Sequence, residues 1–144
     1  MLRSWVGDNA QIATLALDAV MRRSLEEAVR LCTPDVRLRT LFDEPDAPEI
    51  FGHDHERLVG HEGLREWFNR LDRLWAFLEL RHVDTDERED GWVLLRVTAR
   101  ARGRGSAHEA ELKIAVAIQV VDGLVARAEL YMDEADALAS IAAG

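Results

Sequence analysis

The sequence predicts an α+β fold, in which a curved antiparallel or mixed sheet forms a cone covered by three helices from the N-terminal half, with a short C-terminal helix. Three observations predict it. Apolar residues recur at helical spacing before residue 75 and again after residue 133. Five segments, one before residue 75 and four between residues 75 and 133, alternate apolar and polar residues, as half-buried strands do. The chain has 144 residues, 48% of them hydrophobic, which suits one domain spanning 1–144.

Capping patterns predict where the helices begin. Residues 8–11 form a capping-box variant that opens a helix to about residue 23, and residues 24–27, Ser-Leu-Glu-Glu, form a capping box that begins the second. Pro34 forbids continuation of that second helix, whose inward residues include Cys32, interpreted as a packed small hydrophobe. A third helix is expected from residue 60 to 74, because its apolar residues follow i, i+3, i+4, i+7: Leu64, Trp67, Phe68 and Leu71.

The strands are expected at residues 36–42, 77–84, 92–102, 112–120 and 124–132. Asp122-Gly123 predicts a tight hairpin between the last two, and Asp133 is expected to cap the C-terminal helix. Residues 43–59 contain two prolines and no regular period, so they are expected to form a long loop.

Composition excludes several classes of function. The formal charge of −9 argues against nucleic-acid binding, which depends on clustered Lys and Arg. No stretch approaches the roughly 20 apolar residues of a membrane span, and the N-terminal residues lack the apolar run of a secretory signal. We therefore expect a cytoplasmic protein. The single cysteine, Cys32, excludes an intramolecular disulfide and a thiolate metal cluster.

Several short motifs in this order resemble the SnoaL-like branch of the nuclear transport factor 2-like superfamily. They are Ser-Leu-Glu-Glu-Ala at 24–28, Pro-Asp-Val at 34–36, Gly-His-Glu-Gly-Leu-Arg-Glu-Trp-Phe at 60–68, Val-Asp-Gly-Leu-Val at 121–125 and Tyr-Met-Asp-Glu-Ala-Asp-Ala-Leu at 131–138. The resemblance covers nearly the whole chain. It implies a cone with a ligand cavity between the concave sheet and the helices, and dimers formed through the convex face. It implies no single activity, because the family includes isomerases, cyclases, hydrolases and proteins that only bind.

The catalytic residues of two related enzyme classes do not carry over. Ketosteroid isomerases place two acids and a tyrosine at positions that match Thr40, Val116 and Ala16 here. Limonene epoxide hydrolases need an Arg and Asp pair and a further Asp, at positions that hold Val97, Ala99 and Leu130. Neither mechanism is therefore expected.

The side chains expected inside the cone therefore predict an apolar pocket with few polar groups, suited to a hydrophobic small molecule. The expected lining is Ala16, Thr40, Phe68, His82, Val97, Ala99, Ile114, Val116, Ala128, Leu130 and Met132. The alternative is that these side chains simply fill the interior.

His82 is the candidate for chemistry, because it shares the apolar face of its strand and an imidazole titrates near neutrality. The other interpretation is a core or rim histidine bonded to a backbone carbonyl. His53, Asp54, His55 and His61 raise the question of a metal. No metal or cofactor is expected, because the four offer no helical i, i+4 pair and lie in or near the predicted loop.

Three functions follow. The first is a protein that binds a hydrophobic small molecule, and the second is an isomerase, cyclase or hydratase with His82 as general base. The third is a dimeric interaction module with a filled interior. A homodimer is expected through the convex sheet face, at Ala115, Ala117, Gln119, Arg127, Glu129 and Tyr131.

Overall fold

The computed structural model describes residues 8–41 and 58–144, and the structural statements below concern these residues. The helices are α1 (Asp8–Met21), α2 (Leu25–Leu31), α3 (Gly60–Leu74) and α4 (Glu134–Ala143). The strands are β1 (Cys32–Arg39), β2 (Leu58–Val59), β3 (Trp75–Glu87), β4 (Trp92–Gly103), β5 (Ala110–Val121) and β6 (Leu124–Tyr131). The α+β prediction is confirmed.

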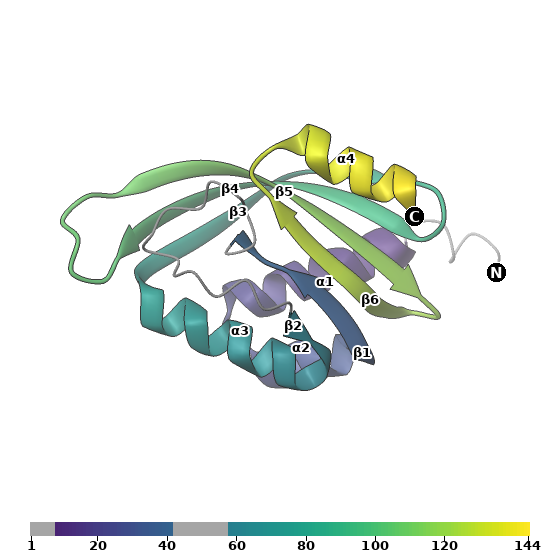
Figure 1. Ribbon diagram of the computed structural model, residues 1–144, viewed down its shortest axis with the longest axis horizontal. Coiled ribbons are helices and arrows are strands. Elements are labelled where there is room, and N and C mark those ends of the chain that lie inside the picture. Colours follow the sequence, from purple (N-terminus) through teal and green to yellow (C-terminus); the bar gives the residue numbers. More distant parts are fainter. Residues whose placement is uncertain (1–7, 42–57) are drawn as a thin grey trace.

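One open, curved sheet organises the molecule, with strand order β2-β1-β6-β5-β4-β3 (Figure 1). The β1–β6 pair is parallel and the other pairs are antiparallel, so the sheet is mixed. Helices α1, α2 and α3 lie on the concave side, whereas α4 lies across the convex side (Figure 1). No helix in the described part of the chain is long and apolar enough to cross a bilayer.

Two of the three predicted helix caps are present, and the third, at Asp8, rests on a side chain outside the described part of the structure. Ser24 Oγ accepts a hydrogen bond from the backbone N–H of Glu27 at 3.4 Å, and Asp133 Oδ1 accepts one from that of Ala135 at 2.9 Å. The four apolar residues predicted to face inward on α3 are all buried. Capping signals and apolar spacing are local features, which is why they located these helices within two residues.

The first strand begins earlier than predicted, at Cys32 rather than at residue 36. Cys32, expected on a helix, directly follows α2 and opens β1, and Pro34 lies inside the strand. The pairing of β1 with β6 shifts register between Cys32 and Arg37, so Pro34 falls where no ladder bond is required of it. The strand ends at Arg39, and residues 40 and 41 of the predicted segment are not strand, whereas residue 42 lies outside the described residues.

Most of the predicted 43–59 loop lies outside the described residues. Its last two residues are not loop, because Leu58 and Val59 form β2 and pair with Leu38 and Arg37 of β1. β3 also exceeds its prediction, running from Trp75 to Glu87 with a register shift between His82 and Asp84. Residues 84–87 lack an apolar alternation, because three of the four are acidic, so the sequence does not indicate this extension. They nevertheless pair with residues 93–96 of β4.

Two hydrophobic clusters lie on opposite faces of the sheet. The larger one fills the cone between the concave face and α1, α2 and α3. The smaller one lies between the convex face and α4, and its buried members are Trp92, Leu94, Ala115, Ala117, Tyr131 and Ala137. Alanines at 115 and 117 leave room for a helix to approach the strand closely.

Candidate functional site

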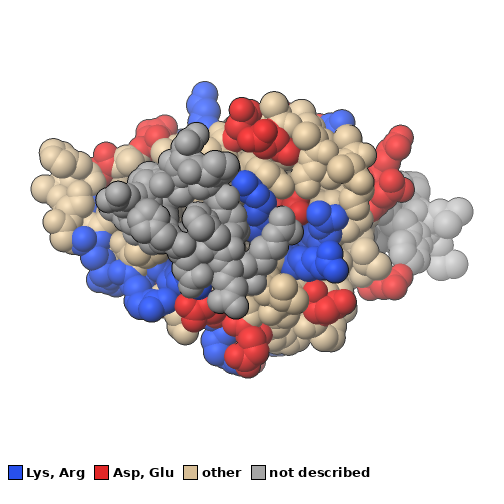
Figure 2. Space-filling view, in the orientation of Figure 1, with Lys and Arg blue, Asp and Glu red and all other residues tan. Residues whose placement is uncertain are grey.

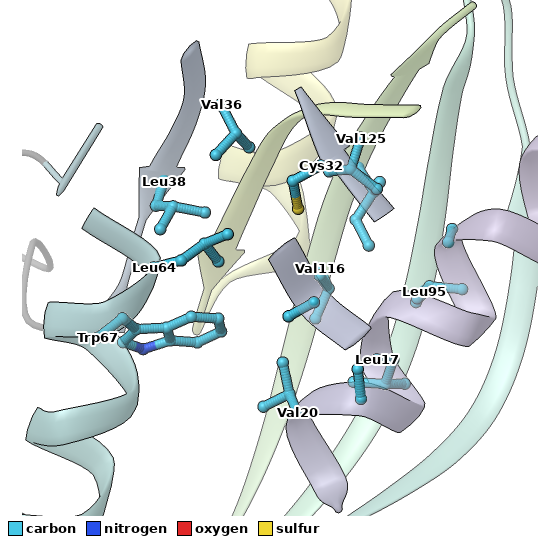
Figure 3. Packing of buried hydrophobic residues seen from close by; sticks show 14 of the residues in the cluster. Leu17, Val20, Cys32, Val36, Leu38, Leu64, Trp67, Leu95, Val116 and Val125 are labelled. Atoms are coloured by element: carbon cyan, nitrogen blue, oxygen red, sulfur yellow. The ribbon is translucent and has the colours of Figure 1, made fainter. Parts of the chain in front are cut away.

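A cavity of about 90 Å³ lies inside the cone, between the concave sheet face and α1, α2 and α3. Its walls consist of Ala, Val, Leu, Ile and Trp side chains and one cysteine. Figure 3 shows side chains from both layers facing one another, among them Leu17 of α1, Trp67 of α3 and Val116 of β5. Alternation in the strands and helical spacing in α1 and α3 direct these apolar groups to one common interior.

Seven of the eleven predicted lining residues come together around this cavity. They are Ala16, Val97, Ala99, Ile114, Val116, Ala128 and Leu130. All but Ala16 come from β4, β5 and β6, where each alternation is long and pairs with a neighbouring strand on both sides. That these residues bind a ligand stays a prediction.

Thr40, Phe68, His82 and Met132 are not among the lining residues. Phe68 is buried in the core, where its ring packs edge-on against Trp67 with centroids 6.0 Å apart, and Trp67 itself reaches the cavity. Thr40 is buried just after β1 ends. Met132 follows β6 and is exposed, because the chain turns there toward α4.

The His82 ring forms local hydrogen bonds near the edge of the sheet. Its Nε2 lies 3.1 Å from the backbone oxygen of Asp84 and 2.7 Å from Oγ1 of Thr85. Depending on the tautomer, Nε2 donates to the carbonyl oxygen of Asp84 or accepts from the hydroxyl of Thr85. A contact with a backbone carbonyl is what we expected if His82 is a core or rim histidine and not a general base. The register shift after His82 brings Asp84 and Thr85 within reach of the ring.

Cys32 contributes the one thiol of the cavity wall. It is buried, and burial raises the pKa of its thiol to about 11. The thiol is therefore neutral at physiological pH, and Cys32 acts as the packed apolar residue that the sequence interpretation proposed.

Several wall residues were missed by the sequence analysis, including Trp67, Trp75, Leu78, Leu80 and Leu112. Leu78 and Leu80 alternate with His82, and Leu112 alternates with Ile114, so the signal was present. What the pattern could not show is how far along each strand the cavity extends, since that depends on where the helices cover the sheet.

Among the described residues, no three His, Cys, Asp or Glu side chains are grouped as a metal site would require. His53, Asp54 and His55 lie outside those residues. His61 Nε2 lies 3.4 Å from the backbone oxygen of Cys32, at the start of α3.

The residues predicted to form a dimer interface lie on the convex face, where α4 covers much of them within the same chain. Ala115, Ala117, Glu129 and Tyr131 are all buried. Gln119 Nε2 donates to the backbone oxygen of Asp90, and Arg127 Nη2 lies 2.8 Å from Oε2 of Glu129. Sequence alternation identified this face as separate from the core but did not reveal that α4 packs on it. Dimerisation itself stays a prediction.

The fold is similar to several solved structures. A nuclear transport factor 2-like protein of unknown function from Burkholderia pseudomallei matches with a TM-score of 0.73 and 20% identity, over 92% of this chain and 95% of that one. The protein TerC, co-crystallised with polyporic acid, matches with a TM-score of 0.70 and 20% identity, over 90% and 94% of the two chains. A candidate polyketide cyclase from Xanthomonas campestris matches with a TM-score of 0.68 and 15% identity, over 93% and 96%.

These identities are low, so the likeness concerns the fold alone. No protein with a curated functional description matches the chain. The sequence profile of the SnoaL-like domain matches residues 13–128, which include most of α1, the cavity-forming strands β4 and β5, and most of the paired part of β6. The chain therefore belongs to the SnoaL-like domain family.

Proposed function

We propose that this SnoaL-like protein binds a small, wholly apolar molecule in the concave cavity. The observation that carries the proposal is the chemistry of the wall, in which every side chain is aliphatic, indole or thiol. Such a wall offers a ligand almost no hydrogen bond, so binding would be driven by removal of apolar surface from water. A polar ligand would lose its hydration there without compensation.

The cavity volume limits the size of the ligand. An apolar cavity of roughly 150 Å³ can stay dry and bind benzene, whereas sites for drug-sized ligands occupy about 300–1,000 Å³. At about 90 Å³ the cavity favours a molecule no larger than a single small ring, unless side chains rearrange. Space of this size also favours binding over a completely filled interior.

TerC, which shares the fold, was co-crystallised with polyporic acid. That observation supports a small-molecule role for folds of this kind. It does not name the ligand here, because the residues that would contact it differ at this level of identity.

The alternative of an isomerase, cyclase or hydratase with His82 as general base is less well supported. His82 is not part of the cavity wall, and its Nε2 is hydrogen-bonded to its own strand. A base must reach the proton that it removes, either directly or through one water. Catalysis by His82 would require the ring to leave these bonds and turn into the cone.

Benzene is a suitable probe of the apolar cavity. We expect its addition to raise the Tm and to shift methyl NMR resonances of cavity residues such as Val97 and Val116, because a ligand that binds only the folded state stabilises it. At a tenfold excess over its Kd the gain is about 1.4 kcal/mol. His82→Ala should respond as the wild type does.

Ala99→Leu should abolish the response, because Ala99 lines the cavity and the added carbons would occupy it. Ala76→Leu is the matched control, since Ala76 is exposed on β3. Saturating benzene that left the methyl resonances unchanged would contradict the proposal, as would an undiminished response in a folded Ala99→Leu variant.

A further inference from the structure

A second pocket lies on the outer face of the sheet, where β1 pairs with β6. It has a volume of about 330 Å³, and three arginines, Arg37, Arg39 and Arg127, line it together with Glu129 and three apolar residues. Figure 2 shows basic side chains gathered on the face that carries β1 and β6. Among the described lining residues, three guanidinium groups and one carboxylate carry a formal excess of two positive charges, in a chain whose formal charge is −9.

The strand register places like charges opposite each other. Arg37 of β1 is the partner of Arg127 of β6, and Arg39 is the partner of Glu129. Like charges at directly opposed positions of a sheet destabilise it. A bound anion would reduce the repulsion between the guanidinium groups of Arg37 and Arg127.

Glu129 offsets the charge of only one of the three arginines, Arg127. Its Oε1 accepts hydrogen bonds from Tyr131 Oη at 3.0 Å and Ser140 Oγ at 2.6 Å, and its Oε2 accepts one from Arg127 Nη2 at 2.8 Å. The carboxylate is thus engaged by groups of β6 and α4. The Arg37 side chain is exposed and forms no hydrogen bond or ion pair with any other described residue.

Neighbouring groups hold the other two arginines in place. The Arg39 guanidinium stacks 4.0 Å from the centroid of Tyr131, and its Nη1 donates to the backbone oxygen of Leu130 at 2.6 Å. Arg127 lies 5.0 Å from the centroid of Trp92 and donates to the backbone oxygen of Gly144 at 3.1 Å. Groups held in advance lose less conformational freedom when a ligand binds.

We propose that this outer pocket, hereafter the arginine pocket, binds a small ligand through a phosphate or carboxylate group. Guanidinium groups match the geometry of both oxyanions and donate paired hydrogen bonds to them. Arg39 and Arg127 supply guanidinium groups that are already held in place, and the exposed Arg37 supplies a third that can reach the anion. The site is separate from the concave cavity and does not depend on the function proposed for it.

Inorganic phosphate and succinate serve as the two probes, in separate titrations at low salt followed by calorimetry. We expect saturable binding of at least one, and the stronger probe identifies which oxyanion the arginine pocket prefers. Arg37→Gln should weaken that binding at least about tenfold, because it removes a charge-assisted hydrogen bond to the anion. Arg100→Gln is the control, since Arg100 lies on the same sheet but pairs with Glu109 at 3.0 Å.

Two results would overturn the proposal. One is the absence of saturable binding of either probe, and the other is an equal loss of affinity in Arg37→Gln and Arg100→Gln. A variant in which the acidic residues between 43 and 56 become amides adds a further test. If phosphate bound to that variant but not to the wild type, we would conclude that the arginines form ion pairs with carboxylates of the same chain and do not form a site for an external ligand. The benzene response of the concave cavity should be unchanged in Arg37→Gln, which separates the two proposals.

Discussion

Glu129 shows how a carboxylate can remain charged although only 6% of its surface is exposed. Burial alone would raise the pKa of this group, but hydrogen bonds from Ser140, Arg127 and Tyr131 and the charge of Arg127 lower it below its usual value. A carboxylate with a lowered pKa stabilises the fold above the pKa of the unfolded state, about 4.3. That contribution is lost as the pH falls through the folded-state value.

We predict that Glu129→Gln destabilises the protein at pH 7 by about 1–3 kcal/mol, the usual range for hydrogen bonds to a charged group. The difference in Tm between variant and wild type should begin to shrink below the unfolded-state pKa of about 4.3 and continue to shrink as the pH falls through the lower folded-state pKa. Thermal unfolding from pH 3 to 7 measures both effects. Glu26→Gln should change little, because Glu26 is 84% exposed in its pair with Arg30. A constant difference in Tm at every pH would show that the charge of Glu129 is not the cause.

At the scale of elements, two Asp-Gly turns have nearly the same backbone but different surroundings. Asp90-Gly91 joins β3 to β4 with φ angles of 59° and 80°, and Asp122-Gly123 joins β5 to β6 with 52° and 81°. A Cβ atom on Gly91 would lie 2.3 Å from the backbone oxygen of Val120, whereas one on Gly123 would meet nothing within 4 Å. The first turn packs against β5, and the second extends into solvent.

We therefore predict that Gly123→Ala costs about 1 kcal/mol, the strain of a left-handed alanine, whereas Gly91→Ala costs about 3 kcal/mol or more. The extra cost arises because the new methyl group must displace Val120, whose N–H donates to the Gly91 oxygen at 2.9 Å. Urea unfolding at constant m-value measures the two changes. Equal destabilisation would show that the two turns tolerate a side chain alike.

Local signals predicted the elements well where the residues that define them are adjacent in the chain. Ser24 and Asp133 cap their helices through residues two or three positions away, and Asp122-Gly123 forms its turn as predicted. β2 was missed, because a strand of two residues has no period of its own and exists only through its pairing with β1.

At the scale of the whole molecule, the oligomeric state depends on which surface remains free. Ala117 has no exposed surface, because α4 covers it, so a charge at this position would unfold the smaller cluster before it could report on a dimer. A dimer through the convex face would have to bury α4 in the interface, together with the charged residues of the uncovered strands.

We predict a homodimer and therefore a sedimenting mass of twice 16.3 kDa at micromolar concentrations. Sedimentation velocity over a hundredfold range of concentration measures it directly. A single species of 16.3 kDa throughout that range would show that the chain acts alone and that α4 replaces a partner on the convex face.

By itself the sequence determined the fold class, the four predicted helix starts and the apolar face of the long central strands. These depend on spacing and capping, which act over a few residues. It also determined the apolar character of the cavity, since seven predicted residues line it.

Only the tertiary structure decided which polar residues reach that cavity and what covers the other face of the sheet. His82 follows the apolar alternation of its strand, yet a register shift beside it supplies a carbonyl and a hydroxyl that hold the ring near the sheet edge. The arginine pocket likewise required the pairing of β1 with β6, whose partners lie about 90 residues apart in the chain. Contacts between such distant residues depend on how the layers pack, which no local pattern encodes.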